Sequence, residues 1–194
     1  MLDEDSVKEG KVCEPKVWDG FDWDWFRSVP TWHLPFWSKL DLYRTAAALK
    51  ERPISAIKES EVLNANVIWD AKTSKLSGFG LPEIDNPLDF DEEKRLIFGE
   101  DRHSYMFSDN KSYIFGVTAW TDGQQSWGLW TTGPLTPEIR EKALGHAKQL
   151  GFNQNFAIES SNANFVKLLI DTIFRFQFVS YFSPISCFQN NKIK

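Results

Sequence analysis

Residues 112–133 read SYIFGVTAWTDGQQSWGLWTTG, which is two apolar segments on either side of an Asp-Gly pair. Asp-Gly between such segments is a strong signal for a tight β-hairpin turn. We therefore expect adjacent antiparallel strands over Ser112–Trp120 and Ser126–Thr132, joined at Asp122-Gly123. A helix over Thr136–Leu150 should follow, because Thr136 suits an N-cap and a proline occupies the first helical position.

The residues around this hairpin extend the pattern in both directions. A strand is expected before it at Ser104–Ser108, and a short strand after the helix at Asn155–Glu159. A second helix then begins at Ser160 or Ser161, and two final strands lie within Phe176–Phe188. The order β-β-β-α-β-α-β-β favours a right-handed crossover onto a mixed, largely antiparallel sheet, so the fold class is α/β (α+β).

The first half of the chain is less regular. Ser38 is suited to cap a helix that runs to about Arg52, and Pro53 to begin a shorter one. Asn66–Ala71 reads as a short strand. The segment Leu76–Asp101 contains several glycines, prolines and acidic residues, and we expect it to be mainly loop.

The segment 17–37 is rich in tryptophan and contains Pro30 and Pro35, which disfavour a regular helix. We expect an extended aromatic arm, because five indole rings left in water would form a large apolar patch. The rings bind a protein partner, pack on the chain's own sheet, or bind carbohydrate. The predicted partner-binding residues are Trp18, Trp23, Trp25, Trp32 and Trp37.

The predicted organisation has four parts: an arm over 1–37, a helical and loop segment over 38–101 that packs on the core, the core itself over 102–188, and a tail over 189–194. The core resembles the GNAT fold of acyl-CoA-dependent N-acetyltransferases. The similarity lies in Phe115-Gly116, in the strand Trp127–Trp130 that would bind acyl-CoA, and in Asn162–Leu169 with its Asn-x-x-Phe-x-x-Leu pattern.

The loop that would hold the cofactor departs from that family. Thr131–Pro137 has one glycine, no basic residue and two prolines, each of which removes an N–H donor. The strand Ser126–Thr132 carries no Asp, Glu or His that could act as a general base. We therefore expect no catalytic residue and no cofactor. In an active enzyme, acetyl-CoA would contact the backbone of Leu129, Trp130, Thr132 and Gly133.

The resemblance also bears on function. Ser161-Asn162 with Phe165–Leu169 is similar to an internal virion protein of short-tailed phages that looks GNAT-like. The leading hypothesis is a non-catalytic structural or accessory protein, a tailed-phage virion component acting through protein–protein contacts or self-assembly. The alternatives are an active N-acetyltransferase and a carbohydrate-binding module that uses the tryptophan-rich arm.

Composition and charge also bear on which partners, metal sites and cellular locations are expected. The 194 residues carry a net charge of −5 without a run of Lys and Arg, which argues against nucleic acid as a partner. Cys13 and Cys187 do not make a disulfide framework, and the three histidines are scattered, so no metal site is expected. The acidic N-terminus lacks the features of a signal peptide, and charges interrupt the apolar stretch Phe165–Phe178. We expect a cytoplasmic protein, or one in the virion if phage-encoded, without a membrane span.

Overall fold

The computed structural model describes residues 17–160, apart from 88, 91–94 and 99–100. The helices are α1 (Trp23–Ser28), α2 (Lys39–Leu49), α3 (Glu59–Leu63) and α4 (Pro137–Gln149), with 3₁₀ turns η2 (Ile54–Ala56) and η3 (Gln154–Phe156). The strands are β1 (Thr31–Ser38), β2 (Val67–Asp70), β3 (Lys75–Gly78), β4 (Leu81–Asp85), β5 (Asp89–Phe90), β6 (Leu96–Phe98), β7 (Asp101–Ser108), β8 (Tyr113–Ala119), β9 (Gln125–Thr131) and β10 (Ala157–Glu159).

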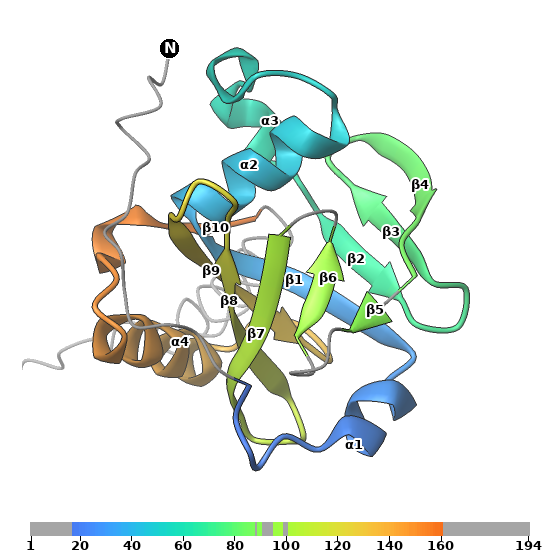
Figure 1. Cartoon of the computed structure of the whole chain (residues 1–194), viewed down its shortest axis with the longest axis vertical. Coiled ribbons are helices and arrows are strands. Elements are labelled where there is room, and N and C mark those ends of the chain that lie inside the picture. The colour runs from blue at the N-terminus through green and yellow to red at the C-terminus, as the bar shows by residue number, and fades with distance from the viewer. Residues whose placement is uncertain (1–16, 88, 91–94, 99–100, 161–194) are drawn as a thin grey trace, which may run out of the picture.

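The strands form one sheet in the order β4-β3-β2-β1-β9-β8-β7-β6-β5, and β10 also pairs with β1. Every pairing among the described strands is antiparallel. The two ends of this path, β4 and β5, are separated in the chain only by residues 86–88. So short a connection spans at most about 14 Å. The sheet is therefore rolled, and its two ends lie on the same side of the molecule (Figure 1).

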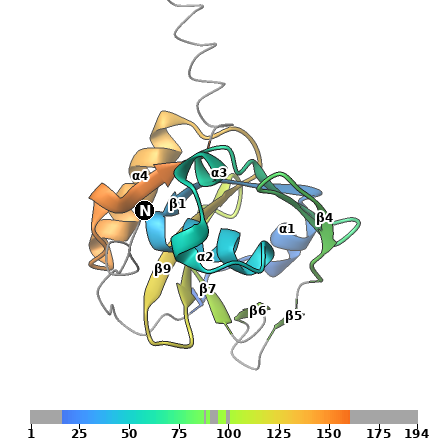
Figure 2. The same ribbon diagram turned by 90° about the horizontal axis from the view of Figure 1, so that it is seen from above.

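Three helices take distinct places around the rolled sheet. Figure 1 shows α2 at one end, α1 at the other, and α4 on the outside. In the view from above, α2 lies within the outline of the strands, across that opening of the sheet (Figure 2). Both openings of the rolled sheet are thus covered by segments that lie next to β1 in the chain.

A bulge in β1 changes which of its side chains point to each face of the sheet. Its pairing with β9 shifts register between His33 and Phe36, where Pro35 has no N–H to donate. The bulge changes the alternation of side chains. Leu34 and Trp37 belong to the inner cluster, whereas Phe36 packs outward against α4 and its neighbours.

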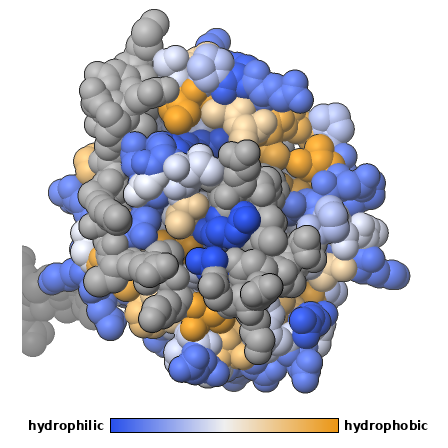
Figure 3. Space-filling model, viewed as in Figure 1, coloured by the Kyte–Doolittle hydropathy of each residue, from blue (hydrophilic) through white to orange (hydrophobic). Residues whose placement is uncertain are grey.

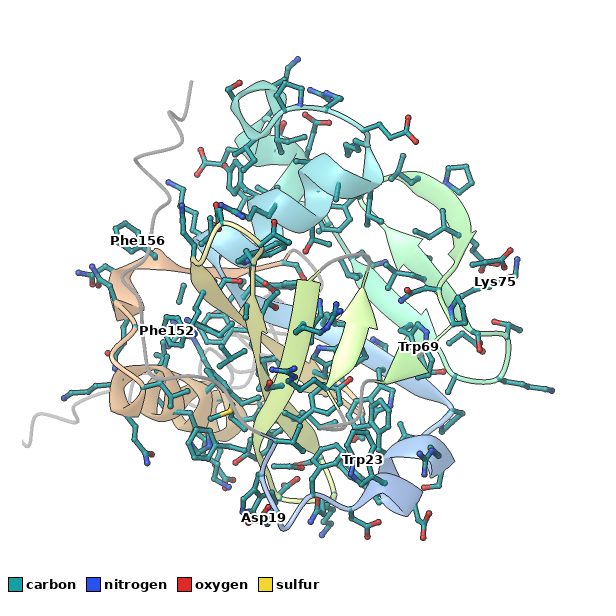
Figure 4. The ribbon with its side chains drawn as sticks, in the orientation of Figure 1. Asp19, Trp23, Trp69, Lys75, Phe152 and Phe156 are labelled. Carbon is teal, nitrogen blue, oxygen red and sulfur yellow. The ribbon has the colours of Figure 1, made fainter. Side chains whose placement is uncertain are left out.

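The aromatic floor is the group of rings that fills the rolled sheet near α1. Its central member is Phe26, which is fully buried and lies 5.4 Å from both Trp32 and Tyr105, measured between ring centroids. Figure 4 shows Trp23 and Trp69 at this end of the molecule, and Phe26 contacts both of them. The floor consists of Phe21, Phe26, Trp32, Trp69, Tyr105 and Trp130.

A second cluster, the outer core, lies between the sheet and α4. Phe115 and Trp127 stack here at 5.2 Å, and Ala143 and Ala147 of α4 are completely buried. Since β8 and β9 are covered on both faces, they read as nearly continuous apolar runs in the sequence. Phe152, labelled in Figure 4, closes this cluster beyond the end of α4.

Several expectations are confirmed. β8 and β9 pair antiparallel around Asp122-Gly123, where Gly123 takes the positive φ of 82° that the turn needs. α4 follows with Thr136 as its N-cap, and α2 begins after Ser38, whose side chain accepts the Asp41 N–H. The short strand expected near Asn66–Ala71 is β2.

Three other expectations are wrong. Leu76–Asp101 was expected to be a loop, but it includes parts of β3 to β7. Its Gly80 and Pro87 lie between strands, and Gly78 and Pro82 lie at or near strand ends. The described sheet has no parallel crossover, since β10 pairs antiparallel with β1. Residues 17–37 are not an extended arm. They contain α1, which Asp22 caps through the Trp25 N–H, and most of the central strand β1.

The single sheet contains strands from each of the segments 1–37, 38–101 and 102–188. Residues 1–16, the expected second helix and final strands within 161–188, the tail and both cysteines lie outside the described residues.

Within the described residues, no helix has the length and apolar character needed to cross a membrane. Hydrophilic side chains cover much of the face drawn in Figure 3, with hydrophobic ones visible between them.

Candidate functional site

A pocket lies inside the rolled sheet, between α2 and the aromatic floor. Its empty volume is about 760 Å³, part of which is open to solvent. The lining comes from α2, β1, β2, β3, β7, β8 and β9, so strands from both halves of the sheet surround it. Aliphatic side chains line one part of it, namely Leu34, Val67 and Leu76.

Two glycines create the space for this pocket. Gly116 of β8 lies directly opposite Gly128 of β9, and both line the pocket. On the same face of the hairpin, the neighbouring pairs are Ile114 with Trp130 and Thr118 with Ser126. A larger side chain at either glycine would project inward, because residues two apart in a strand share a face. The facing glycines thus leave a gap in an otherwise filled interior.

Aromatic side chains form much of the remaining wall. Trp37, Trp120 and Trp130 contribute indole rings, and Tyr105 contributes a phenol. Tyr105 is 1% exposed, and its hydroxyl has no hydrogen-bond partner within the described part of the chain. Burial raises the pKa of this hydroxyl above its usual value, so it stays protonated. Tyr105 therefore offers a neutral donor and acceptor at the floor of the pocket.

His103 of β7 brings an imidazole to the wall. Its Nδ1 lies 2.8 Å from the Thr118 hydroxyl oxygen across the β7–β8 ladder, within hydrogen-bond distance. Burial lowers the pKa of His103 to about 4, because the surrounding protein disfavours the charged ring. The imidazole is therefore neutral at pH 7 and contributes hydrogen-bonding capacity without positive charge.

A hydrogen-bond chain fixes α2 against the pocket wall. The Trp120 indole N–H donates to Ser126 Oγ at 2.7 Å, and the Ser126 hydroxyl donates to Asp41 Oδ1 at 2.6 Å. Ser38 Oγ accepts both the Asp41 N–H, as the helix cap, and the Trp127 N–H of β9. Asp41 is only 3% exposed and lines the pocket. Its carboxylate is held in place by the sheet.

The tip of the β8–β9 hairpin is tied to the same helix. The Arg44 guanidinium of α2 forms an ion pair with Asp122 in the turn and lies 5.0 Å from the centroid of the Trp120 ring. Thr45 and Ala48, one turn along α2, line the pocket and retain exposed surface. The mouth of the pocket is thus bordered by α2 and by this hairpin.

The five tryptophans predicted to bind a partner differ in how deeply they are buried. Trp32 and Trp37 are 0% and 3% exposed, so they pack within the chain. Trp23 and Trp25 are partly buried against the inner cluster, and Trp18 is 40% exposed. Of the five, only Trp37 reaches the pocket. Binding of a protein partner through Trp18, Trp23 and Trp25 stays a prediction.

The backbone groups that acetyl-CoA would contact in an active enzyme have partners in the fold. Leu129 and Trp130 lie in the β8–β9 ladder, and Leu129 also pairs with β1. The Thr132 N–H donates to the Ser112 carbonyl, and the Gly133 carbonyl accepts from the Thr131 hydroxyl. These groups do not form an open loop of amides of the kind that cradles a pyrophosphate.

The histidines lie far apart in different surroundings. His33 is on β1 and His103 in the pocket, whereas His146 of α4 stacks on Phe107 at 4.1 Å and hydrogen-bonds the Tyr113 hydroxyl. Within the described ranges, no three His, Cys, Asp or Glu side chains come together as metal ligands.

Of the residues that line the pocket, only Trp37 and Trp130 were predicted from the sequence as site residues, and both were assigned to other roles. The facing glycines were open to prediction, because a hairpin centred on Asp122 places residue 116 opposite residue 128. Their common inward face also follows from the alternation in β8 and β9. Asp41 and His103 carry no such signal, since they line the same pocket only when α2 and β7 close around the hairpin.

The matches to known proteins are to solved structures. No protein-family model matches the chain, and no curated protein does. Among solved structures, the chain is similar to the siderocalin Ex-FABP, described as functioning through dual ligand specificities. The TM-score is 0.46 and the identity 10%, over 69% of this chain and 93% of that one.

The described sheet corrects the expected relationship. Every pairing among the described strands is antiparallel, so the predicted resemblance to the GNAT fold, and to the internal virion protein that looks GNAT-like, is wrong. A β-β-β-α-β order has more than one solution, and here β10 returns to β1 instead of continuing a mixed sheet.

Proposed function

We propose that this protein binds a small, largely apolar organic molecule in the pocket inside its rolled sheet, without transforming it. The observation that carries the proposal is the facing pair Gly116 and Gly128, which opens a space in the interior.

The lining supports this type of ligand. Aromatic and aliphatic side chains dominate it, and a few polar groups are held at fixed positions, as in most small-molecule sites. The Tyr105 hydroxyl is neutral at pH 7 and is suited to orient a ligand by hydrogen bonds, and the neutral His103 imidazole adds no charge to the wall. Indole rings favour a ligand that is itself flat and ring-containing.

A matched pair of substitutions tests the proposal. The probe is naphthalen-2-ylmethanol, a neutral two-ring alcohol, titrated by isothermal calorimetry. Gly116→Leu should abolish binding, because the leucine side chain fills the pocket. The fold should tolerate the change, because a Cβ added at Gly116 makes only ordinary contacts of 3.6 Å with Tyr105 and 3.7 Å with the Ser104 carbonyl. Gly145→Leu is the control, since a Cβ on this exposed residue of α4 meets nothing within 4 Å.

The expected result is binding by the wild type and by Gly145→Leu, and none by folded Gly116→Leu. If Gly116→Leu fails to fold, the smaller Gly116→Ala should still weaken binding. Wild-type protein that gives no heat with the probe, or a Gly116→Ala variant that binds it unchanged, would contradict the proposal.

A further inference from the structure

Tyr105 stands in register with the two glycines that open the pocket. It pairs with Gly116 of β8, Gly116 pairs with Gly128 of β9, and Gly128 pairs with Trp37 of β1. These four residues form one row across the sheet, with an aromatic side chain at each end and no side chain at the two middle positions. The Trp37 indole N–H already donates to the Leu34 carbonyl at 2.6 Å. The side-chain polar group of this row that has no partner within the described chain is the Tyr105 hydroxyl.

The Tyr105 ring borders the space that Gly116 leaves. A Cβ added at Gly116 would lie 3.6 Å from Cδ1 of Tyr105. Because a strand side chain stands roughly perpendicular to its sheet, the phenol hydroxyl reaches further into the rolled sheet than Cδ1 does. The hydroxyl is thus carried inward from the glycine gap and away from solvent, in a residue that lines the pocket.

The rings packed around Tyr105 give its hydroxyl no acceptor. Phe21 lies 5.1 Å from the phenol ring, Phe26 5.4 Å and Trp130 6.1 Å, measured between ring centroids. Phenylalanine has no hydrogen-bonding group, and the indole N–H is only a donor. A buried hydroxyl that makes no hydrogen bond destabilises a fold, so such a group calls for an explanation. An acceptor carried by a ligand would remove that cost.

The state of the phenol indicates which acceptor suits it. Burial raises the pKa of Tyr105, so the hydroxyl keeps its proton at pH 7 and is able to donate it in a hydrogen bond. A neutral carbonyl accepts such a bond without bringing charge into a poorly solvated interior, whereas a carboxylate brings a full charge. A carbonyl conjugated to an aromatic ring is also coplanar with it, which keeps the ligand flat.

We propose that the ligand is a neutral aromatic carbonyl compound, and that the Tyr105 hydroxyl donates the hydrogen bond that orients it. This inference rests on the proposed function. It names the class of ligand, and it assigns Tyr105 as the residue that selects for the carbonyl.

Two probes of nearly the same shape separate the hydrogen bond from packing. The first is 1-(naphthalen-2-yl)ethanone, and the second is 2-(prop-1-en-2-yl)naphthalene, in which a CH₂ group replaces the carbonyl oxygen. Calorimetry measures the affinity of both for the wild type, Tyr105→Phe and Tyr43→Phe. Tyr43 is the matched control, since it is also fully buried and its hydroxyl also has no partner within the described residues, but it does not line the pocket.

The ketone should bind Tyr105→Phe about tenfold more weakly than the wild type or Tyr43→Phe, as the loss of one buried hydrogen bond would give. The alkene should bind all three proteins alike. A ketone affinity that is the same in Tyr105→Phe, or an equal loss for both probes, overturns the inference and leaves the proposed function intact. If neither of these probes nor naphthalen-2-ylmethanol binds the wild type, the proposed function itself fails.

Tyr105→Phe should fold, because it removes a hydroxyl that has no partner within the described chain. If it does not, the infrared spectrum of the ¹³C-carbonyl ketone bound to the wild type decides. A hydrogen bond lowers the carbonyl stretching frequency, so the band should lie below its position in hexane. A band at the hexane position overturns the inference.

Discussion

The neutral imidazole of His103 should make the fold sensitive to acid. Its pKa is about 4 in the folded protein because of burial, against 6.5 for an unperturbed histidine. The unfolded chain therefore binds this proton more readily than the folded one. The stability from this group is fully present above pH 6.5 and is lost as the pH falls towards 4. At about 1.36 kcal/mol for each pH unit, the loss is about 3 kcal/mol.

The assay is urea unfolding of the wild type and of His103→Asn at several pH values between 7 and 4. Asparagine cannot titrate, and its amide is suited to hydrogen-bond the Thr118 hydroxyl in place of Nδ1. Burial also lowers the pKa values of His33 and His146, but these two residues are present in both proteins and give a shared background. Stability should fall more steeply with acid in the wild type, by about 3 kcal/mol at pH 4. Parallel curves for the two proteins would refute the reasoning.

Three further substitutions test the structure around the pocket, each measured by urea unfolding at pH 7. Phe26→Ala should destabilise by about 3–5 kcal/mol, because it removes the central ring of the aromatic floor, and a loss below about 1 kcal/mol would mean that residues 17–37 are not core. Ser38→Ala should cost about 1–2 kcal/mol, since the cap of α2 and the acceptor for the Trp127 N–H are lost together; an unchanged stability would contradict both bonds. Arg44→Met should cost less than about 1 kcal/mol, because its partner Asp122 is exposed, and a larger loss would show that the ion pair does more than tether the hairpin.

The parts of the fold that could be predicted are those encoded locally. The β8–β9 hairpin follows from Asp122-Gly123, and the starts of α2 and α4 follow from Ser38 and Thr136, whose side chains bond backbone amides within three residues. These interactions act over a few residues, so a short stretch of sequence contains the whole signal.

The segment 17–37 was misread because its prolines point to an extended chain while its role depends on distant partners. Pro35 is tolerated in the central strand only because β1 bulges there, and the bulge is seen only when β9 pairs alongside. Phe26 and Trp32 become core through contacts with Trp69, Tyr105 and Trp130, which lie up to about a hundred residues away in the chain. No local pattern contains that information.

The strands between Leu76 and Asp101 escaped prediction for a different reason. β5 and β6 are only two and three residues long, and β4 contains Pro82 and two acidic residues. Strands of this length are too short to show an alternating pattern, so the sequence does not distinguish them from a loop. Their identity as strands comes from closure of the rolled sheet.

The most direct test of the central claim is a ¹H–¹⁵N correlation spectrum recorded with and without naphthalen-2-ylmethanol. The account predicts that the amide signals of Gly116 and Gly128, the two residues that open the pocket, shift most as the probe is added. The amides of Ala143 and Ala147, buried in the outer core on the other face of the sheet, should stay in place. Shifts concentrated in α4, or a spectrum unchanged at millimolar probe, would contradict the claim that this interior pocket is the binding site.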